Sequence, residues 1–149
     1  MKTIFALALL ISANAFALGR PLLSYVGTSG GGTAPQYHIT TNCDVYPEAV
    51  VKVVNGGIVG VSNKSKPVAW TSVIPNEQTL AALIVKAQAG KIDSRPGAIG
   101  GFTTTYVGHI NTFETVNDVT LQKSGGIVVE KNKSREAKEL VKFIDYNCK

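Results

Sequence analysis

The chain has 149 residues, of which 44% are hydrophobic, and a formal net charge of +5. This length indicates one domain, with enough chain to bury roughly two-thirds of its unfolded surface. The basic excess is mild and scattered. Since the sequence lacks the stripe of basic residues interleaved with aromatics that nucleic-acid binding requires, we expect no nucleic-acid partner.

Residues 1–17 have the pattern of a cleaved secretion signal. Lys2 supplies a positive start, residues 4–11 are apolar, and Ala15 and Ala17 fit the small-residue rule for cleavage. The apolar stretch is shorter than the about 20 residues that a membrane-spanning helix needs. We therefore expect cleavage near Ala17, a single mature domain at residues 18–149, no stable membrane insertion, and a secreted or periplasmic location.

In the first half of the mature chain, short apolar runs alternate with turn signals. The glycine-rich residues 27–36 lack the spacing of a phosphate-binding loop and predict a surface connection. Asn55-Gly56 is a hairpin signal, whereas residues 62–67 are polar and predict a turn. The predicted strands of this half are residues 22–26, 37–45, 49–54, 58–61 and 68–73.

The second half begins and ends with a helix. Asn76 is the expected N-cap of the first, which Gly90 ends. Residues 134–148 predict the second, capped by Ser134 or Asn132. Residues 91–101 predict an irregular segment. The predicted strands of this half are residues 102–110 and 127–131, and a tight hairpin of 113–116 and 119–122 around Asn117-Asp118.

Many short strands with two helices, without the regular alternation of a doubly wound fold, predict an α+β domain. We expect a mostly antiparallel twisted sheet with one central and one C-terminal helix packed on it.

The two cysteines, Cys43 and Cys148, predict one disulfide in an exported protein. Alternation along residues 37–45 places Cys43 on the more apolar side of its strand. Helical spacing places Cys148 on the same stripe as Leu140 and Ile144. Both cysteines therefore face the core, and their disulfide ties the last helix to an early strand. The alternative, free reactive thiols, lacks the C-x-x-C spacing or nearby histidine that would favour it.

Two internal echoes occur in the sequence. Residues 56–65 and 125–134 both read GGIVxxxNKS, and the segment SYVG at 24–27 resembles TYVG at 105–108. A duplicated, pseudo-symmetric domain would produce such echoes, but shared turn chemistry explains them more simply.

The sequence has no recognisable catalytic or metal-binding motif. Its two histidines, His38 and His109, lie in predicted strands without the H-E-x-x-H spacing of zinc enzymes. The serine motif S-x-x-K is missing, and no pair of carboxylates stands out for acid–base chemistry. We therefore assign no catalytic residue, metal ligand or cofactor, and we expect a protein that is not an enzyme.

The 91–101 segment is the first candidate for binding. It contains Lys91 and Arg95, and the bond between Lys91 and Ile92 would be the basic bait bond of a protease inhibitor. A rigid, presented loop lowers the ordering cost of binding. An ordinary helix-to-strand connection also fits a segment of this length.

The strand at 102–110 is the second candidate. It carries Phe102, Tyr106 and His109 among threonines, a surface that suits stacking on a sugar or pairing with a peptide strand. Because alternation puts Phe102 and Tyr106 on one face, a core role for both is favoured.

We therefore expect a secreted or periplasmic, non-catalytic binding module whose partner is another protein or an envelope component. One alternative is a protease inhibitor that presents the 91–101 segment. The other is a small hydrolase with an unrecognised site around His38 or His109.

Overall fold

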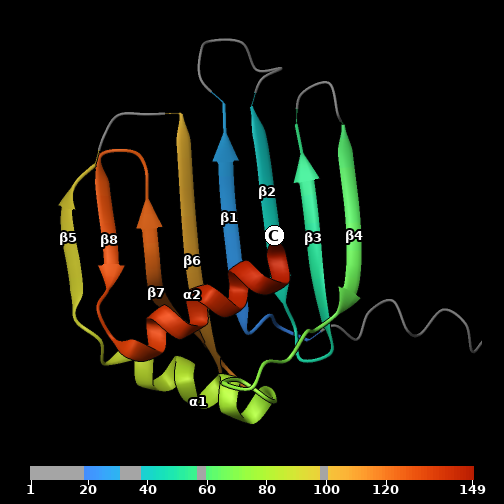
Figure 1. Cartoon of the computed structure of the whole chain (residues 1–149), viewed down its shortest axis with the longest axis vertical. Helices are drawn as coiled ribbons and strands as arrows, with labels where there is room; N and C mark the ends of the chain where they lie inside the picture. The colour runs from blue at the N-terminus through green and yellow to red at the C-terminus, as the bar shows by residue number, and fades with distance from the viewer. Residues whose placement is uncertain (1–18, 31–37, 57–59, 98–100) are drawn as a thin grey trace, which may run out of the picture.

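The computed structural model describes residues 19–30, 38–56, 60–97 and 101–149. In these parts of the chain, eight strands form one antiparallel sheet and two helices pack on one of its faces (Figure 1). The α+β prediction, with a central helix, a C-terminal helix and one disulfide, is confirmed. The predicted signal at 1–17 lies outside the described residues. The elements are β1 (Leu23–Ser29), β2 (Ile39–Val45), β3 (Ala49–Asn55), β4 (Val61–Pro67), α1 (Glu77–Gln88), β5 (Ile92–Pro96), β6 (Phe102–Asn111), β7 (Val116–Ser124), β8 (Val128–Asn132) and α2 (Arg135–Cys148).

The sheet extends outward from a central antiparallel pair, β1 and β6, in the order β4-β3-β2-β1-β6-β7-β8-β5. The strands β2, β3 and β4 follow β1 toward one edge, and β7 and β8 follow β6 toward the other. β5 precedes β6 in the chain but pairs with β8 at the far edge. The two edges of the sheet are therefore β4 and β5 (Figure 1).

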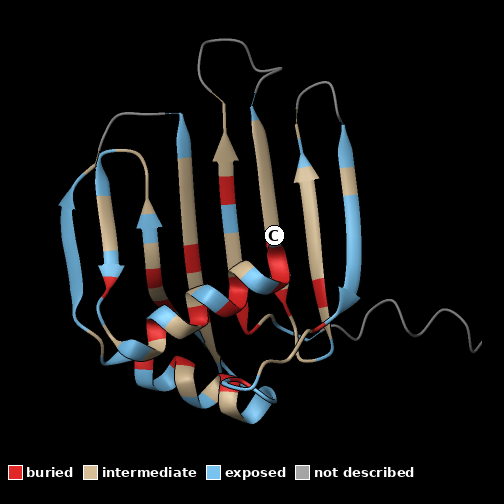
Figure 2. Ribbon diagram, in the orientation of Figure 1, coloured by how far each residue is buried: buried red, intermediate tan, exposed pale blue. Residues whose placement is uncertain are grey.

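The helices cover one end of one face of the sheet. They lie across the end where β1 begins and β6 ends, which we call the helix end; the loop end is the opposite one, where β1 ends and β6 begins (Figure 1). Buried residues gather at the helix end, and most strand residues toward the loop end are intermediate or exposed (Figure 2). No described helix covers the second face, which we call the open face and which presents alternate residues such as Ser24, Asn42 and His109.

The core lies between the sheet and the two helices. In β1, β2 and β6, residues buried against the helices alternate with less buried residues on the open face. Gly108 on β6 lets α1 approach closely, because a Cβ there would lie 2.9 Å from Ile84 Cγ2. The large, fully buried apolar side chains are those of Leu23, Val45, Val50, Ile74, Leu80, Ile84, Leu121, Leu140 and Ile144.

Both helices begin at the predicted caps. Asn76 Oδ1 accepts a hydrogen bond from the Thr79 amide at 2.9 Å, and Ser134 Oγ accepts one from the Ala137 amide at 3.1 Å. Each cap satisfies an amide that the first turn of a helix leaves unpaired. Within the described residues, neither helix combines the length and apolar character needed to cross a membrane.

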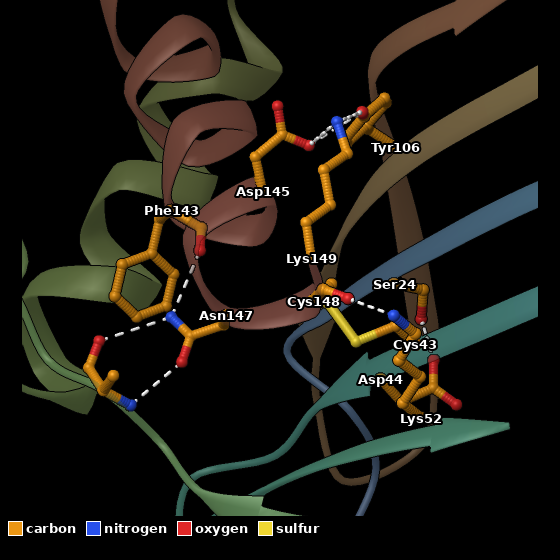
Figure 3. Close-up of a disulfide and its surroundings, with 11 residues drawn as sticks. Ser24, Cys43, Asp44, Lys52, Tyr106, Phe143, Asp145, Asn147, Cys148 and Lys149 are labelled. Atoms are coloured by element: carbon orange, nitrogen blue, oxygen red, sulfur yellow. Dashed lines mark hydrogen bonds and ion pairs between the residues drawn. A yellow bond between two sulfur atoms is a disulfide. The ribbon is translucent and has the colours of Figure 1, made fainter. Parts of the chain in front are cut away.

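The predicted disulfide joins Cys43 on β2 to Cys148 at the end of α2 (Figure 3). Both residues are buried, and their Cα atoms lie 5.9 Å apart. Two further contacts fix the same end of α2. Lys52 Nζ donates to the Cys148 carbonyl at 2.8 Å, and the buried Asn147 side chain bonds both backbone groups of Ala69. The end of α2 is thus tied to the sheet and to the connection that precedes α1.

Two predictions in the first half are wrong. The polar residues 62–67, expected to form a turn, belong to the strand β4, since an edge strand with exposed side chains needs no apolar alternation. The expected strand at 68–73 is an irregular connection. Individual apolar side chains of this connection pack into the core. Val68 and, just beyond the expected strand, Ile74 are buried, and Trp70 packs against Phe143 with ring centroids 5.9 Å apart.

Two predictions in the second half are also wrong. Residues 92–96, expected to be irregular, form the edge strand β5, all of whose residues are exposed. The hairpin turn expected at Asn117-Asp118 lies earlier, where Thr112 and Thr115 bond to each other through backbone and hydroxyl groups. Asn117-Asp118 is part of the continuous strand β7. A β-bulge opposite Tyr106 and Val107 interrupts the register of β7 and obscures its alternation.

Candidate functional site

The five residues predicted for binding lie in separate places. Lys91 and Arg95 are exposed near opposite ends of β5, on the edge of the sheet. Phe102 begins β6 at the loop end and is 72% exposed. Tyr106 is buried beneath α2, whereas His109 lies on the open face near the helix end. The structure therefore does not assemble these five residues into one site.

Tyr106 has a packing role at the centre of the fold. Its ring packs on that of Tyr25, with centroids 5.0 Å apart, and its hydroxyl donates to Asp145 Oδ1 at 2.8 Å (Figure 3). Burial, together with the hydrogen bond to Asp145, raises the pKa of Tyr106 above its ordinary value. The side chain thus links α2 to the central strand pair.

His109 is the centre of a row of four polar side chains on the open face, which we call the His109 row. Its Nε2 lies 2.8 Å from Ser24 Oγ, and its Nδ1 lies 2.8 Å from Asp118 Oδ1. Ser24 Oγ donates to Asp44 Oδ1 at 2.6 Å. The four residues come from the adjacent strands β2, β1, β6 and β7, so the sheet register alone brings them together.

The His109 row has the contacts of a Ser-His-Asp triad with a fourth member added. In a triad, the carboxylate orients the ring, and the opposite ring nitrogen takes the proton of the serine. Here the Ser24 hydroxyl donates to Asp44, so His109 Nε2 must itself donate to Ser24 Oγ. Nδ1 faces the Asp118 carboxylate, so both ring nitrogens of His109 lie against oxygen atoms of neighbouring strands.

A cavity of about 500 Å³ opens at the helix end beside His109. Its volume falls within the range of small-molecule clefts. The lining mixes apolar side chains from the sheet and α1 with a few polar ones. The lining residues are Gly19, Arg20, Leu22, Pro47, Glu77, Ala81, Val85, His109, Ile110 and Asn111.

Sequence reasoning missed the His109 row for a definite reason. Its members are separated by up to 94 positions, and no motif links them. Asp118 was expected in a turn, so its place opposite His109 could not be foreseen. The available signal was alternation, which puts Ser24, Asp44 and His109 on the polar side of their strands.

A second feature lies at the loop end, where exposed apolar residues occur in neighbouring segments of the chain. Phe102 is 72% exposed, Ile127 82% and Val128 40%, and Pro96 beside them is also exposed. We call these four residues the apolar corner. Phe102 comes from the start of β6, Ile127 and Val128 from the turn into β8, and Pro96 from the end of β5. The register places Phe102 on the face that carries the helices, with Tyr106, and places Pro96 and Val128 on the open face. The four residues therefore surround this corner of the sheet from both faces.

Close backbone contacts hold the apolar corner in place. The Gly97 amide donates to the Ile127 carbonyl at 2.8 Å, which joins the end of β5 to the turn. Gly125 has a positive φ of 92°, and a Cβ there would lie 2.0 Å from the Phe102 carbonyl oxygen. Only glycine permits this conformation and approach without strain. The residues between Gly97 and Gly101 lie outside the described part of the chain.

Comparison with known proteins identifies no relative of this chain. No family model matches the chain, and no curated protein or solved structure shows significant similarity to it. Within the described residues, no group of three or more histidine, cysteine or acidic side chains is placed to hold a metal ion.

Proposed function

We propose that this protein is a secreted or periplasmic, non-catalytic binding module that recognises another protein or an envelope component through the apolar corner. The supporting observation is that Phe102 and Ile127 are both largely exposed, in neighbouring segments whose backbones Gly97 and Gly125 hold together. Single exposed apolar residues are common, but exposed apolar residues gathered in one region of the surface are typical of interaction sites.

The expected contribution of the apolar corner follows from its two most exposed side chains. Complete burial of a large apolar side chain is worth about 1.5–3 kcal/mol. Loss of both side chains therefore corresponds to a reduction in affinity of about a hundredfold or more. The backbone of the apolar corner is already braced, so little ordering cost opposes binding.

The test is capture by the mature protein from envelope and medium extracts, followed by quantitative binding of each captured partner to variants. We expect F102S/I127S to lose the partner while its thermal unfolding stays unchanged. The matched control is F113S, because Phe113 is fully exposed in the β6–β7 turn at the opposite end of the sheet. Unchanged binding to F102S/I127S, or an equal loss with F113S, rejects the proposal.

The inhibitor alternative is less favoured by the geometry of β5. The Lys91 carbonyl, on the acyl side of the expected bait bond, accepts a hydrogen bond from the Lys133 amide at 2.9 Å. The next five residues pair with β8 along the sheet instead of projecting from it. Because the backbone on both sides of the Lys91–Ile92 bond is hydrogen-bonded within the sheet, this bond does not project as an inhibitor loop would.

A hydrolase is the second candidate function, and the His109 row favours it. Ser24, His109 and Asp118 have the contact order of nucleophile, base and orienting carboxylate. Two features oppose it. Asp44 competes for the Ser24 proton, and β1 is paired on both sides, so its amides are committed to the sheet and cannot stabilise an oxyanion.

A fluorophosphonate probe distinguishes the two functions. A hydrolase requires covalent labelling at Ser24 that is lost in S24A and strongly reduced in H109Q. A binding module requires the absence of labelling, with partner binding intact in S24A.

A further inference from the structure

A basic groove lies near the β4 edge of the sheet, whereas the apolar corner lies near the β5 edge. The groove is a cavity of about 570 Å³ between β3, β4 and the end of α2. Four lysines, Lys52, Lys64, Lys66 and Lys149, contribute to its lining, together with Val50, Asn63, Ser65, Asn147 and Cys148. Among the described residues that line the basic groove, no carboxylate side chain occurs.

The register of the sheet concentrates the positive charge. Lys52 on β3 is the direct cross-strand partner of Lys64 on β4, and Lys66 lies two residues further along the same face. Directly opposed residues have Cβ atoms about 5 Å apart, and residues i and i+2 lie roughly 7 Å apart. Like charges placed directly opposite each other destabilise a sheet. The arrangement therefore has an electrostatic cost in the absence of a counter-charge.

Two of the lysines have partners within the fold. Lys52 donates to the Cys148 carbonyl at 2.8 Å, which offsets the negative end of helix α2, and Lys149 pairs with Asp145 at 2.8 Å. Lys64 and Lys66 are exposed and make no side-chain hydrogen bond or ion pair with a described residue. These two ammonium groups are available to a ligand.

Protection of an edge strand explains the lysines only in part. Lysines on an edge discourage pairing with other chains, and β4 is an edge. That role needs no lysine on β3, where Lys52 stands opposite Lys64, and no cavity roofed by the end of α2. The groove has the composition of an anion site in addition to that of a protected edge.

We propose that the basic groove binds phosphate groups, with Lys64 and Lys66 as the principal contacts and Lys52 as a nearby charge. Lysine binds phosphate as a compact point charge, and a phosphate group carries enough negative charge, about −1.5 to −2 near neutral pH, to pair with both of these ammonium groups. The site is separate from the apolar corner and does not depend on the function proposed for it. A free phosphate compound and a phospholipid headgroup present the same chemistry.

The test uses the mature, disulfide-bonded protein labelled with ¹⁵N. Inorganic pyrophosphate is the probe for free phosphate, and vesicles of phosphatidylcholine with or without phosphatidylglycerol are the probe for headgroups. We expect saturable shifts of amides in β3, β4 and the end of α2. K64A/K66A should weaken binding about tenfold, and K64R/K66R should largely retain it.

A matched pair controls for net charge. Lys123 and Lys142 are exposed elsewhere on the molecule, so K123A/K142A removes the same charge outside the groove. Shifts with pyrophosphate assign the site to free phosphates, and binding confined to phosphatidylglycerol vesicles assigns it to headgroups. The proposal is overturned if neither probe binds, if the shifts map elsewhere, or if K123A/K142A weakens binding as much as K64A/K66A.

Discussion

Tyr25 and Tyr106 are direct partners in the β1–β6 pair, and their ring centroids lie 5.0 Å apart. They are also the equivalent residues of the SYVG and TYVG echo, whose two copies therefore meet at the centre of the sheet. The longer GGIVxxxNKS echo occupies non-equivalent places, since Asn63 lies in the edge strand β4 and Asn132 is buried at the end of β8. Shared turn chemistry predicts this mismatch.

Removal of the disulfide is expected to cause the largest loss of stability. The C43A/C148A variant releases a sequence separation of 105 residues, for which the chain-entropy model gives about 4–5 kcal/mol. Urea unfolding of the oxidised protein and the variant measures the difference. A loss below about 1 kcal/mol would show that Lys52 and Asn147 suffice to hold α2.

Asn132 is expected to be the most sensitive polar residue of the core. It is 5% exposed, donates to the Ala87 carbonyl at 2.7 Å, and accepts from the Ser134 amide at 3.0 Å. N132A leaves these buried groups unpaired at about 1–3 kcal/mol each, so we expect a loss of roughly 2–4 kcal/mol in chemical denaturation.

Gly90 provides a second test of the same contact. A Cβ at Gly90 would lie 2.0 Å from Asn132 Oδ1, so G90A should displace the amide and reproduce much of the N132A loss. The double variant G90A/N132A should therefore lose less stability than the sum of the two single losses. Additive losses would show that the two substitutions do not act through the contact between these residues.

Tyr106 is expected to make stability fall in alkali. Its pKa in the folded state is raised above the ordinary value of about 10, mainly by burial. The folded protein therefore holds the phenolic proton more tightly than the unfolded chain. This stabilisation is fully present below about pH 10 and is lost as the pH rises through the folded-state pKa. Between about pH 9 and 11.5, the midpoint temperature of thermal unfolding should fall less steeply with pH in Y106F than in the wild type.

Ser134 is expected to stabilise α2 through its cap. S134A removes the acceptor of the Ala137 amide and should cost about 1 kcal/mol. S72A is the matched control, because Ser72 is exposed in the connection before α1, and its effect should stay within about 0.5 kcal/mol. Equal effects of the two substitutions in urea unfolding would contradict a capping role.

The parts of the fold that were predictable are those with strong local signals. The caps Asn76 and Ser134 and the inward positions of Cys43 and Cys148 follow from side-chain chemistry and periodicity. The edge strands β4 and β5 were missed because an exposed strand carries no apolar pattern and is defined by its neighbour alone.

The candidate sites were predictable only in part. Phe102 and Arg95 can be singled out from the sequence, but the turn that places Gly125 against Phe102 and Ile127 against Gly97 depends on backbone contacts between distant segments. The His109 row and the pairing of Lys52 with Lys64 are consequences of strand order and register. Strand order depends on contacts between distant segments, and register depends on the turns and on the apolar pattern of whole strands, which the few residues around these positions do not reveal.

The disulfide between β2 and α2 can form only after nearly the whole chain has been synthesised. Cys43 is synthesised 105 residues before Cys148, and all the later strands, β3 to β8, come between them. At roughly 5–20 residues per second, the Cys43 thiol waits about 5–20 s for its partner. During that interval it can react only with other molecules, so a nascent chain that meets an oxidant too early is expected to yield mixed disulfides or cross-linked dimers.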